Sequence, residues 1–410
     1  MDAEGAYSIL ASDINKEREA RLMTKFDHSI NRPHIFKKND LSILSDSRRS
    51  YVIGRFNCYA KLPSFDNEEV QEANLPIGLE SILATDLYSE SSALLCAQHA
   101  GLITDVLDQE VVLTVFGRMT TGKFDFSIST FPKAGSPQSK NLSVSNAQLE
   151  IDAGYEGIEL FSIVEAKNQS IEDFHIRQLY YPYRLWSSKL LKPVVPVFFT
   201  YSNEIFSFYV YNFTDPNNYN SLQLIRRKHY RIVPTEIEVE DIRRILNQVN
   251  IKPEPTDDVP FPQADRFERV IDLLAQLYSK SSLTQEEITT NYDFDVRQTQ
   301  YYTNAGRYLG LIDRVQVADQ GVTYSLTDFG SCIMRKEPRT RNLALVELIL
   351  SRKVFREAVR YYLTNAEPPV VSEIVKFMQE AGLGIEGETL RRRAQSVIGW
   401  IRWIMNLTTD

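Results

Sequence analysis

The sequence predicts a multidomain protein in which an α/β domain with one mixed central sheet is followed by helical modules. Three observations support this fold class. The chain has 410 residues, which is too long for one core of the usual size. Between about residue 80 and residue 250, a helix, several strands, a helix and two apolar strands follow one another. After a proline-rich stretch the remaining pattern is mostly helical.

The first 75 residues are expected to form a small N-terminal domain. The stretch INKEREARLMTKF predicts a short helix, and VIGRFNCYAKL alternates apolar and polar residues as a strand does.

Residues 76–250 carry the pattern of the α/β domain. The helix SESSALLCAQHAGLITDVL comes first, followed by strands in EVVLTVFG, FDFSISTF, AQLEIDAGYE and IELFSIVEAK. A longer helix follows, and then the apolar runs PVVPVFFTYS and IFSFYVYNF. This order of elements predicts one mixed sheet flanked by helices.

Residues 251–263 are the expected linker, because four prolines in IKPEPTDDVPFPQ disfavour regular structure. Residues 264–336 then read as three helices and a two-strand tail, the plan of a winged helix-turn-helix. Residues 337–410 predict a second helical module similar to a helix-turn-helix, without an evident wing.

Composition and charge narrow the class of protein. The three cysteines are widely spaced and form no metal or disulfide pattern, and no leader or long apolar run is present, so a cytoplasmic protein is expected. The formal net charge of -8, taken alone, argues against nucleic acid as a partner. Local charge has to decide that question.

The chemistry-bearing residues are concentrated in LEIDAGYEGIELFSIVEAK. Glu165 and Lys167 project from the same side of one strand, and Asp152 lies on the polar phase of the preceding strand, opposite Leu149, Ile151 and Ala153. A short turn at Gly157 would bring the two carboxylates and the ammonium together. Hydrolysis of a phosphodiester requires such a group, with carboxylates for Mg²⁺ and a lysine that orients water and stabilises negative charge.

The next helix is expected to begin at Ser170 as N-cap, with Asp173 in its first turn, and to carry Gln178 toward the site. A glutamine there would hold the attacking water or a phosphate oxygen. His175 is expected to be an exposed helix residue, and Glu90 a solvated helix position rather than a third acid of the site.

These residues resemble the PD-(D/E)xK nucleases, and more narrowly type II restriction endonuclease-like proteins with C-terminal winged-helix modules. The resemblance rests on Asp152, the run VEAK at 164–167, the helix residues RQLYYPY at 177–183 and the modules after the linker. It implies that residues 76–250 are a restriction-endonuclease-like domain, that Asp152 and Glu165 bind Mg²⁺ and that Lys167 is the catalytic lysine. No proline precedes Asp152, so Glu156 and Glu159 remain alternatives for the first acid, with Asp152 favoured.

Two groups of polar residues are the expected DNA contacts. In the third helix of the winged module, arginine, glutamine and asparagine side chains can pair with base edges in the major groove, and the candidates are Arg297, Gln298, Gln300, Tyr301, Asn304 and Arg307. The second module counts eleven basic against seven acidic residues over 339–407, with Arg391, Arg392 and Arg393 in succession. Tyr302 and Tyr308 are expected to pack inward, as are Trp400 and Trp403.

The sequence therefore predicts a site-specific, Mg²⁺-dependent endonuclease acting on double-stranded DNA. One active site per chain indicates a homodimer on a palindromic target, and restriction-modification would add a cognate DNA methyltransferase acting on the same site. A structure-specific DNA repair nuclease and a noncatalytic DNA-binding regulator are the alternative functions.

Overall fold

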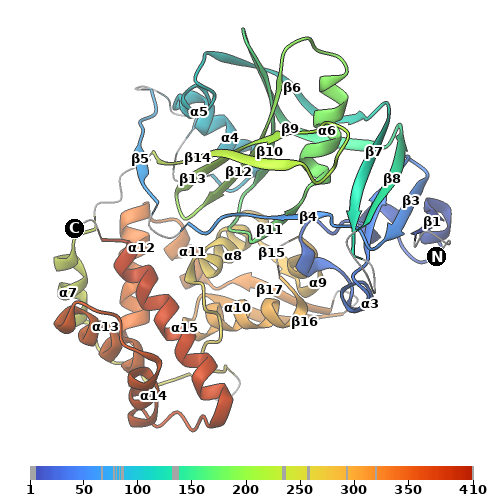
Figure 1. Ribbon diagram of the computed structural model, residues 1–410. Coiled ribbons are helices and arrows are strands. Elements are labelled where there is room, and N and C mark those ends of the chain that lie inside the picture. Colours follow the sequence, from blue (N-terminus) through green and yellow to red (C-terminus); the bar gives the residue numbers. More distant parts are fainter. Residues whose placement is uncertain are drawn as a thin grey trace. The chain divides into compact units, whose positions relative to one another are not determined.

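The computed structural model describes residues 6–65, 68–76, 79, 81–82, 84, 87–131, 138–232, 237–255, 259–291, 294–318 and 321–408 (Figure 1). The chain forms two compact units. Unit 1 is Met1–Tyr201 with Ile205–Ile232, and unit 2 is Ser202–Glu204 with Val233–Asp410. No helix in these ranges is both long enough and apolar enough to cross a membrane.

A mixed seven-stranded sheet is the centre of unit 1, which confirms the expected α/β class. The inner strand β10 is parallel to β12 and antiparallel to β9. In spatial order the strands are β5 (Val70–Glu72), β14 (Leu222–Arg231), β13 (Ile205–Phe213), β12 (Val194–Ser202), β10 (Phe161–Lys167), β9 (Gln148–Gly157) and β6 (Val111–Thr120).

The two faces of this sheet are buried in different cores because side chains alternate along each strand. Val164 and Ala166 of β10 pack in the core that contains residues of α4 (Glu90–His99) and α5 (Leu102–Leu107). Phe161 and Ile163 pack in the core that contains α6 (Arg177–Ser187). Burial on both faces explains why β10 is so apolar.

The N-terminal residues share a core with the central sheet, so the structure does not separate 1–75 from the domain that follows. Val52 and Phe56 lie in the same core as α6. The elements in this part are β1 (Ala6–Leu10), α1 (Ala11–Ile14), α2 (Ala20–Met23), η1 (Ser29–Asn31), α3 (His34–Lys38), β2 (Ser42–Ser45), β3 (Ser50–Gly54) and β4 (Tyr59–Lys61).

The short helix expected over INKEREARLMTKF is only partly formed. Only α1 and α2 are helical there, and the charged residues between them are exposed. A charged stretch without an apolar stripe has no face to bury, so tertiary packing does not stabilise a longer helix. Two further strands outside the central sheet, β7 (Lys123–Thr130) and β8 (Gln138–Ser145), pair with each other.

Unit 2 begins with α7 (Val239–Gln248), which the sequence placed in the nuclease domain. Ile242 and Leu246 are buried in the core of unit 2, and this burial moves the boundary ahead of the expected linker at 251–263. The helix α8 (Phe267–Lys280), the strand β15 (Ser282–Thr284) and the helices α9 (Gln285–Asn291) and α10 (Val296–Tyr308) follow. The strands β16 (Ile312–Val317) and β17 (Gly321–Leu326) complete a sheet in the order β15-β17-β16.

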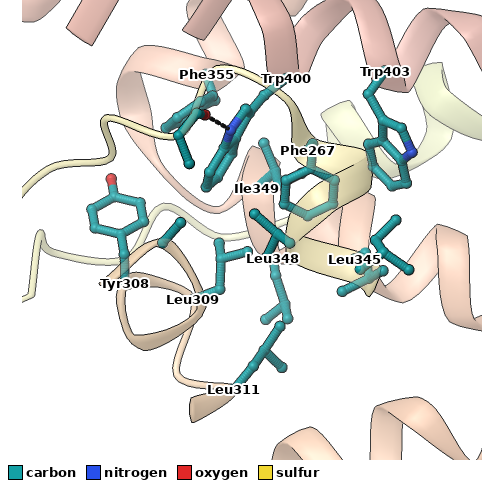
Figure 2. Packing of buried hydrophobic residues seen from close by; sticks show 14 of the residues in the cluster. Phe267, Tyr308, Leu309, Leu311, Leu345, Leu348, Ile349, Phe355, Trp400 and Trp403 are labelled. Carbon is teal, nitrogen blue, oxygen red and sulfur yellow. Dashed lines mark hydrogen bonds between the residues drawn. The ribbon is translucent and has the colours of Figure 1, made fainter. Parts of the chain in front are cut away.

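The remaining chain of unit 2 is helical, with α11 (Asp328–Met334), α12 (Pro338–Leu350), α13 (Lys353–Asn365), α14 (Val371–Glu380) and α15 (Gly387–Asn406). Its core joins the two modules that were expected to be separate at residue 337. Phe267 of α8 packs against Trp400 and Trp403 of α15, with ring centroids 4.7 and 4.5 Å away (Figure 2). Phe355 of α13 stacks on Trp400, whose Nε1 donates a 2.7 Å hydrogen bond to the carbonyl of Ala264 (Figure 2).

Candidate active site

The site lies where the pairing of β9 and β10 ends. The register pairs Ile163 with Gly154 and Val164 with Ala153, so the next position sets Glu165 opposite Asp152. Asp152 does not continue the backbone ladder there. Its Oδ2 accepts a 2.7 Å hydrogen bond from the backbone N–H of Ala166, so a carboxylate replaces the missing carbonyl partner.

The sequence predicts Leu149, Ile151 and Ala153 on one face of β9, and this prediction is wrong for Ala153. Leu149 and Ile151 lie in the core with α6, whereas Ala153 lies in the opposite core, so these three residues do not share a face. The pairing of β6 with β9 shifts register between Val115 and Gly117, beside this point. Such an irregularity redirects side chains locally, and here it brings the Asp152 carboxylate to β10.

Glu165, Lys167 and Gln178 are in direct contact. Lys167 Nζ donates to Glu165 Oε1 at 2.5 Å and to the carbonyl of Ala166 at 3.0 Å. Gln178 Nε2, from the first turn of α6, donates to the same Glu165 oxygen at 2.5 Å. The side chains of Glu165 and Lys167 are only 11% and 10% exposed, and β10 is an inner strand, so this is not a solvated pair on an edge strand.

Glu90 is part of the same cluster, which corrects the expectation of a plain solvated helix position. Its Oε1 lies 4.0 Å from Lys167 Nζ, although the side chain is 42% exposed. Glu90 is the first residue of α4, whose N-cap Ser89 accepts from the backbone N–H of Ser92. This cap fixes where the helix begins, and therefore where Glu90 stands.

The charges in this cluster are poorly balanced. Burial raises the pKa of Glu165 to about 8, and Asp152 and Glu90 oppose the effect of Lys167. Burial also raises the pKa of Asp152 and of Glu90 above their usual values. Burial alone would lower the pKa of Lys167, but Glu165 and the other acids raise it well above its ordinary value. A buried group of acids with one ammonium favours the binding of further positive charge.

The residues present fit a Mg²⁺ ion. Mg²⁺ prefers oxygen ligands and usually takes one or two protein carboxylates while keeping several waters. Asp152 and Glu165 supply two carboxylates, and the Oε1 of Gln178 is buried without a hydrogen-bond partner. Within the part of the chain that the structure describes, no set of three or more His, Cys, Asp or Glu side chains is arranged as a complete ligand shell. A two-carboxylate site does not require such a set.

Neither alternative for the first acid lies in the cluster. Glu156 is bound by Lys192 Nζ at 2.7 Å, and the side chain of Glu159 is exposed. Asp152 is the acid that contacts β10 beside Glu165.

The start of the following helix differs from the expectation. Asp173 and His175 belong to the strand β11 (Asp173–His175), which pairs with β4, and α6 begins only at Arg177. Ser170 is therefore not its N-cap. His175 is buried rather than exposed, contacts the Tyr219 hydroxyl through Nδ1 at 3.2 Å, and has a pKa lowered to about 3 by burial and by Arg177. It is a neutral core histidine.

The expected reading helix is α10, which Asp295 caps by accepting from the backbone N–H groups of Arg297 and Gln298. Tyr302 and Tyr308 are buried, as expected. The candidate contacts differ in exposure: Arg297 and Gln300 are exposed, whereas Gln298, Tyr301, Asn304 and Arg307 are half-buried. Three of them already have partners, because Gln298 Oε1 accepts from the backbone N–H of Asp295 and Arg307 donates to Asn304 Oδ1.

On α15, Arg391 and Arg392 are exposed and Arg393 is half-buried. Burial, with Arg392 beside it, lowers the pKa of Arg393. Trp400 and Trp403 are buried, which confirms that both belong to packing rather than to a stacking surface for bases.

Asp27 is a neighbour of the site that the sequence did not indicate. It interacts electrostatically with Lys167, Glu90 and Asp152, although it lies more than 60 residues before any of them. No local pattern marks it, because only the fold brings residues 24–29 to β11.

Three family models match the chain, and each is a domain of unknown function. They are DUF6996 over residues 1–53, DUF6997 over residues 54–231 and DUF7226 over residues 269–409. The second spans the candidate site and the third spans α10 and α15. Neither the curated proteins nor the solved structures include a match to this chain.

Proposed function

We propose that this protein is a Mg²⁺-dependent endonuclease that cuts double-stranded DNA at specific sites, in the manner of type II restriction enzymes. The observation that carries the proposal is the convergence of Asp152, Glu165, Lys167 and Gln178 at the point where β9 and β10 diverge. The four residues come from three different elements, β9, β10 and α6, and together supply the carboxylates, the ammonium and the amide that suit phosphodiester hydrolysis.

Each residue has a role that follows from its contacts. Asp152 and Glu165 would hold Mg²⁺, which when bound polarises the phosphate and makes water a better nucleophile. Lys167 keeps its positive charge, because the surrounding acids raise its pKa, and is suited to stabilise the negative charge that develops on the phosphate. Gln178 contacts Glu165 through its nitrogen, so its buried oxygen is left to orient a water molecule.

Unit 2 supports DNA as the substrate. The order helix, strand, helix, helix and β-hairpin from α8 to β17 is that of a winged helix-turn-helix, with α10 in the place of the recognition helix. Arg297 and Gln300 on α10 are the exposed candidates for base contacts, and Arg391 and Arg392 on α15 are candidates for phosphate contacts. Cutting both strands with one site per chain would use a homodimer, and a cognate DNA methyltransferase would protect the host.

The test is digestion of a plasmid of varied sequence by wild type, Lys167→Ala and Glu165→Ala, each with Mg²⁺ and with chelator. We expect discrete fragments from wild type with Mg²⁺ alone, and a loss of at least 100-fold in rate for both variants, as for removal of a group that stabilises the transition state. The fragment ends would map the target.

The same unit offers a matched control pair, with its acid on β9 and its lysine just before β12. Lys192 and Glu156 form a Lys–Glu pair at 2.7 Å, outside the cluster, and Lys192→Ala should keep full activity. Equal rates for Lys167→Ala and Lys192→Ala would overturn the active-site assignment. DNA binding without cleavage would indicate a regulator, and cleavage restricted to junctions or flaps would indicate a repair nuclease.

A further inference from the structure

Residues 24–29, here called the N-terminal segment, are fixed against β4 and against β11, the strand that precedes α6. His175 donates its backbone N–H to the carbonyl of Asp27 at 2.9 Å, and the Tyr59 hydroxyl donates to the carbonyl of Phe26 at 2.9 Å. The backbone N–H of Ser29 donates to Asp173 Oδ1 at 2.8 Å. Backbone contacts to both β4 and β11 hold the segment in one place.

The carbonyl of Asp27 is bound by His175, three residues before Gln178, and the side chain of Asp27 is less exposed than that of Lys25. Asp27 is 17% exposed and interacts electrostatically with Lys167 and Glu90. Lys25 Nζ lies 3.5 Å from Asp27 Oδ2, is 47% exposed, and also interacts with Glu90. The segment thus adds a half-exposed cation beside an acidic cluster.

The Lys25 ammonium is suited to bind a phosphate of the DNA backbone. The cluster repels a phosphodiester, because it holds more carboxylates than ammonium groups, and the phosphate must still approach Lys167. A lysine at the rim provides a local contact to the DNA backbone, and an acidic partner limits the orientations of its long side chain.

Resting on the nuclease function proposed above, we infer that the N-terminal segment is the rim of the active site, where Lys25 binds a phosphate of the DNA backbone and Asp27 is the positioning residue that holds Lys25 in place. Lys25 then contributes to binding of the substrate and not to the chemical step.

Salt dependence of DNA binding tests this assignment, because a purely structural role for Lys25 would not alter it. Binding of a fluorescein-labelled duplex is measured in chelator at several salt concentrations. Loss of one phosphate contact lowers the slope of log affinity against log salt by about 0.9. We expect this change for Lys25→Ala, no change for Lys25→Arg, and no change for Lys16→Ala, a matched control in an exposed Lys–Asp pair with Asp13.

Cleavage kinetics and a double-mutant cycle complete the test. Lys25→Ala should raise KM several-fold with kcat within about twofold, because uniform binding is lost. In an Asp27→Asn background, which keeps the backbone contacts, the loss of affinity caused by Lys25→Ala should shrink at least twofold. An unchanged salt slope, or equal losses in both backgrounds, overturns the inference. Absence of cleavage by wild type would instead sink the proposed nuclease.

Discussion

Two buried titratable side chains of unit 1 respond to pH in opposite directions. His175 has a pKa lowered to about 3, so the unfolded chain takes up its proton first as the pH falls. Glu165 has a pKa raised to about 8, so the folded chain binds its proton more tightly than the unfolded chain does. Acid therefore destabilises the fold through His175, and a rise toward pH 8 destabilises it through Glu165.

We predict that His175→Gln reduces the acid sensitivity of unit 1. Between pH 6.5 and pH 5, the histidine of the unfolded chain is protonated and that of the folded chain is not, which costs about 2 kcal/mol of unfolding free energy. Urea denaturation of wild type and variant at pH 7 and pH 5 measures the difference. The same loss in both proteins would show that His175 does not titrate as its burial requires.

We predict that Glu165→Gln reduces the loss of stability that wild type shows as the pH rises toward 8. The folded wild-type chain holds more protons than the unfolded chain between about pH 4.5 and pH 8, so its stability falls across that window. The fall in unfolding free energy from pH 5 to pH 8 should be smaller in the variant by roughly 3 to 4 kcal/mol, and cleavage should be abolished. Paired urea titrations measure the stability, and identical pH profiles of wild type and variant would contradict a raised pKa of the buried Glu165 carboxyl.

At the scale of single elements, α10 separates an exposed polar face from a packing face. Thr299, Tyr302 and Thr303 are buried, and Arg297 and Gln300 are exposed. The sequence pattern identified this division because a helix with period 3.6 exposes one side, and Asp295 fixes where the helix starts.

We predict that Arg297→Ala weakens binding to the mapped target more than binding to random DNA, by about 1 to 3 kcal/mol, because a paired contact to a base edge is lost. Arg360→Ala is the control, since Arg360 pairs with Glu357 on α13 rather than lying on α10. Competition binding with both duplexes measures the ratio. Equal losses on both duplexes would make Arg297 a phosphate contact only.

The helix α15 contributes a tryptophan to the core of unit 2. Trp400 is fully buried, and its indole nitrogen is satisfied by the carbonyl of Ala264. We predict that Trp400→Ala destabilises unit 2 by about 3 to 5 kcal/mol through the cavity and the lost hydrogen bond. Val370→Ala, at a site 60% exposed, should stay within about 0.5 kcal/mol in circular-dichroism denaturation. Similar denaturation midpoints for the two variants would contradict the burial of Trp400 in the core.

At the scale of the whole molecule, each chain carries a single candidate site within its described residues, so double-strand cleavage would need two chains. We predict that an equal mixture of wild type and Lys167→Ala, allowed to exchange subunits and used in excess over a supercoiled single-site plasmid, gives roughly twice as many nicked circles as linear molecules. Mixed dimers cut one strand only. Gel electrophoresis over time distinguishes this from direct linearisation, and linear product alone would mean that one chain cuts both strands.

Local patterns determined much of this molecule. The apolar run of β10, the alternation that puts Glu165 and Lys167 on one side, the apolar stripe of α15 and the cap of α10 all depend on neighbours a few residues away. Such features follow from the period of each element, so they can be predicted without a fold. For the same reason, the sequence predicted most strands of the α/β domain and named Asp152, Glu165, Lys167 and Gln178 as a group.

The tertiary structure alone decided the features that depend on distant contacts. The burial of His175 follows from the pairing of β11 with β4, and the place of Glu90 follows from where α4 meets β10. Asp27 reaches the cluster because the N-terminal segment is held by backbone hydrogen bonds from residues far along the chain. The shared core of α8 and α15 likewise joins two stretches that read as separate modules. Pairing and packing across long sequence separations leave no periodic trace in the sequence, and this is why only the folded chain shows them.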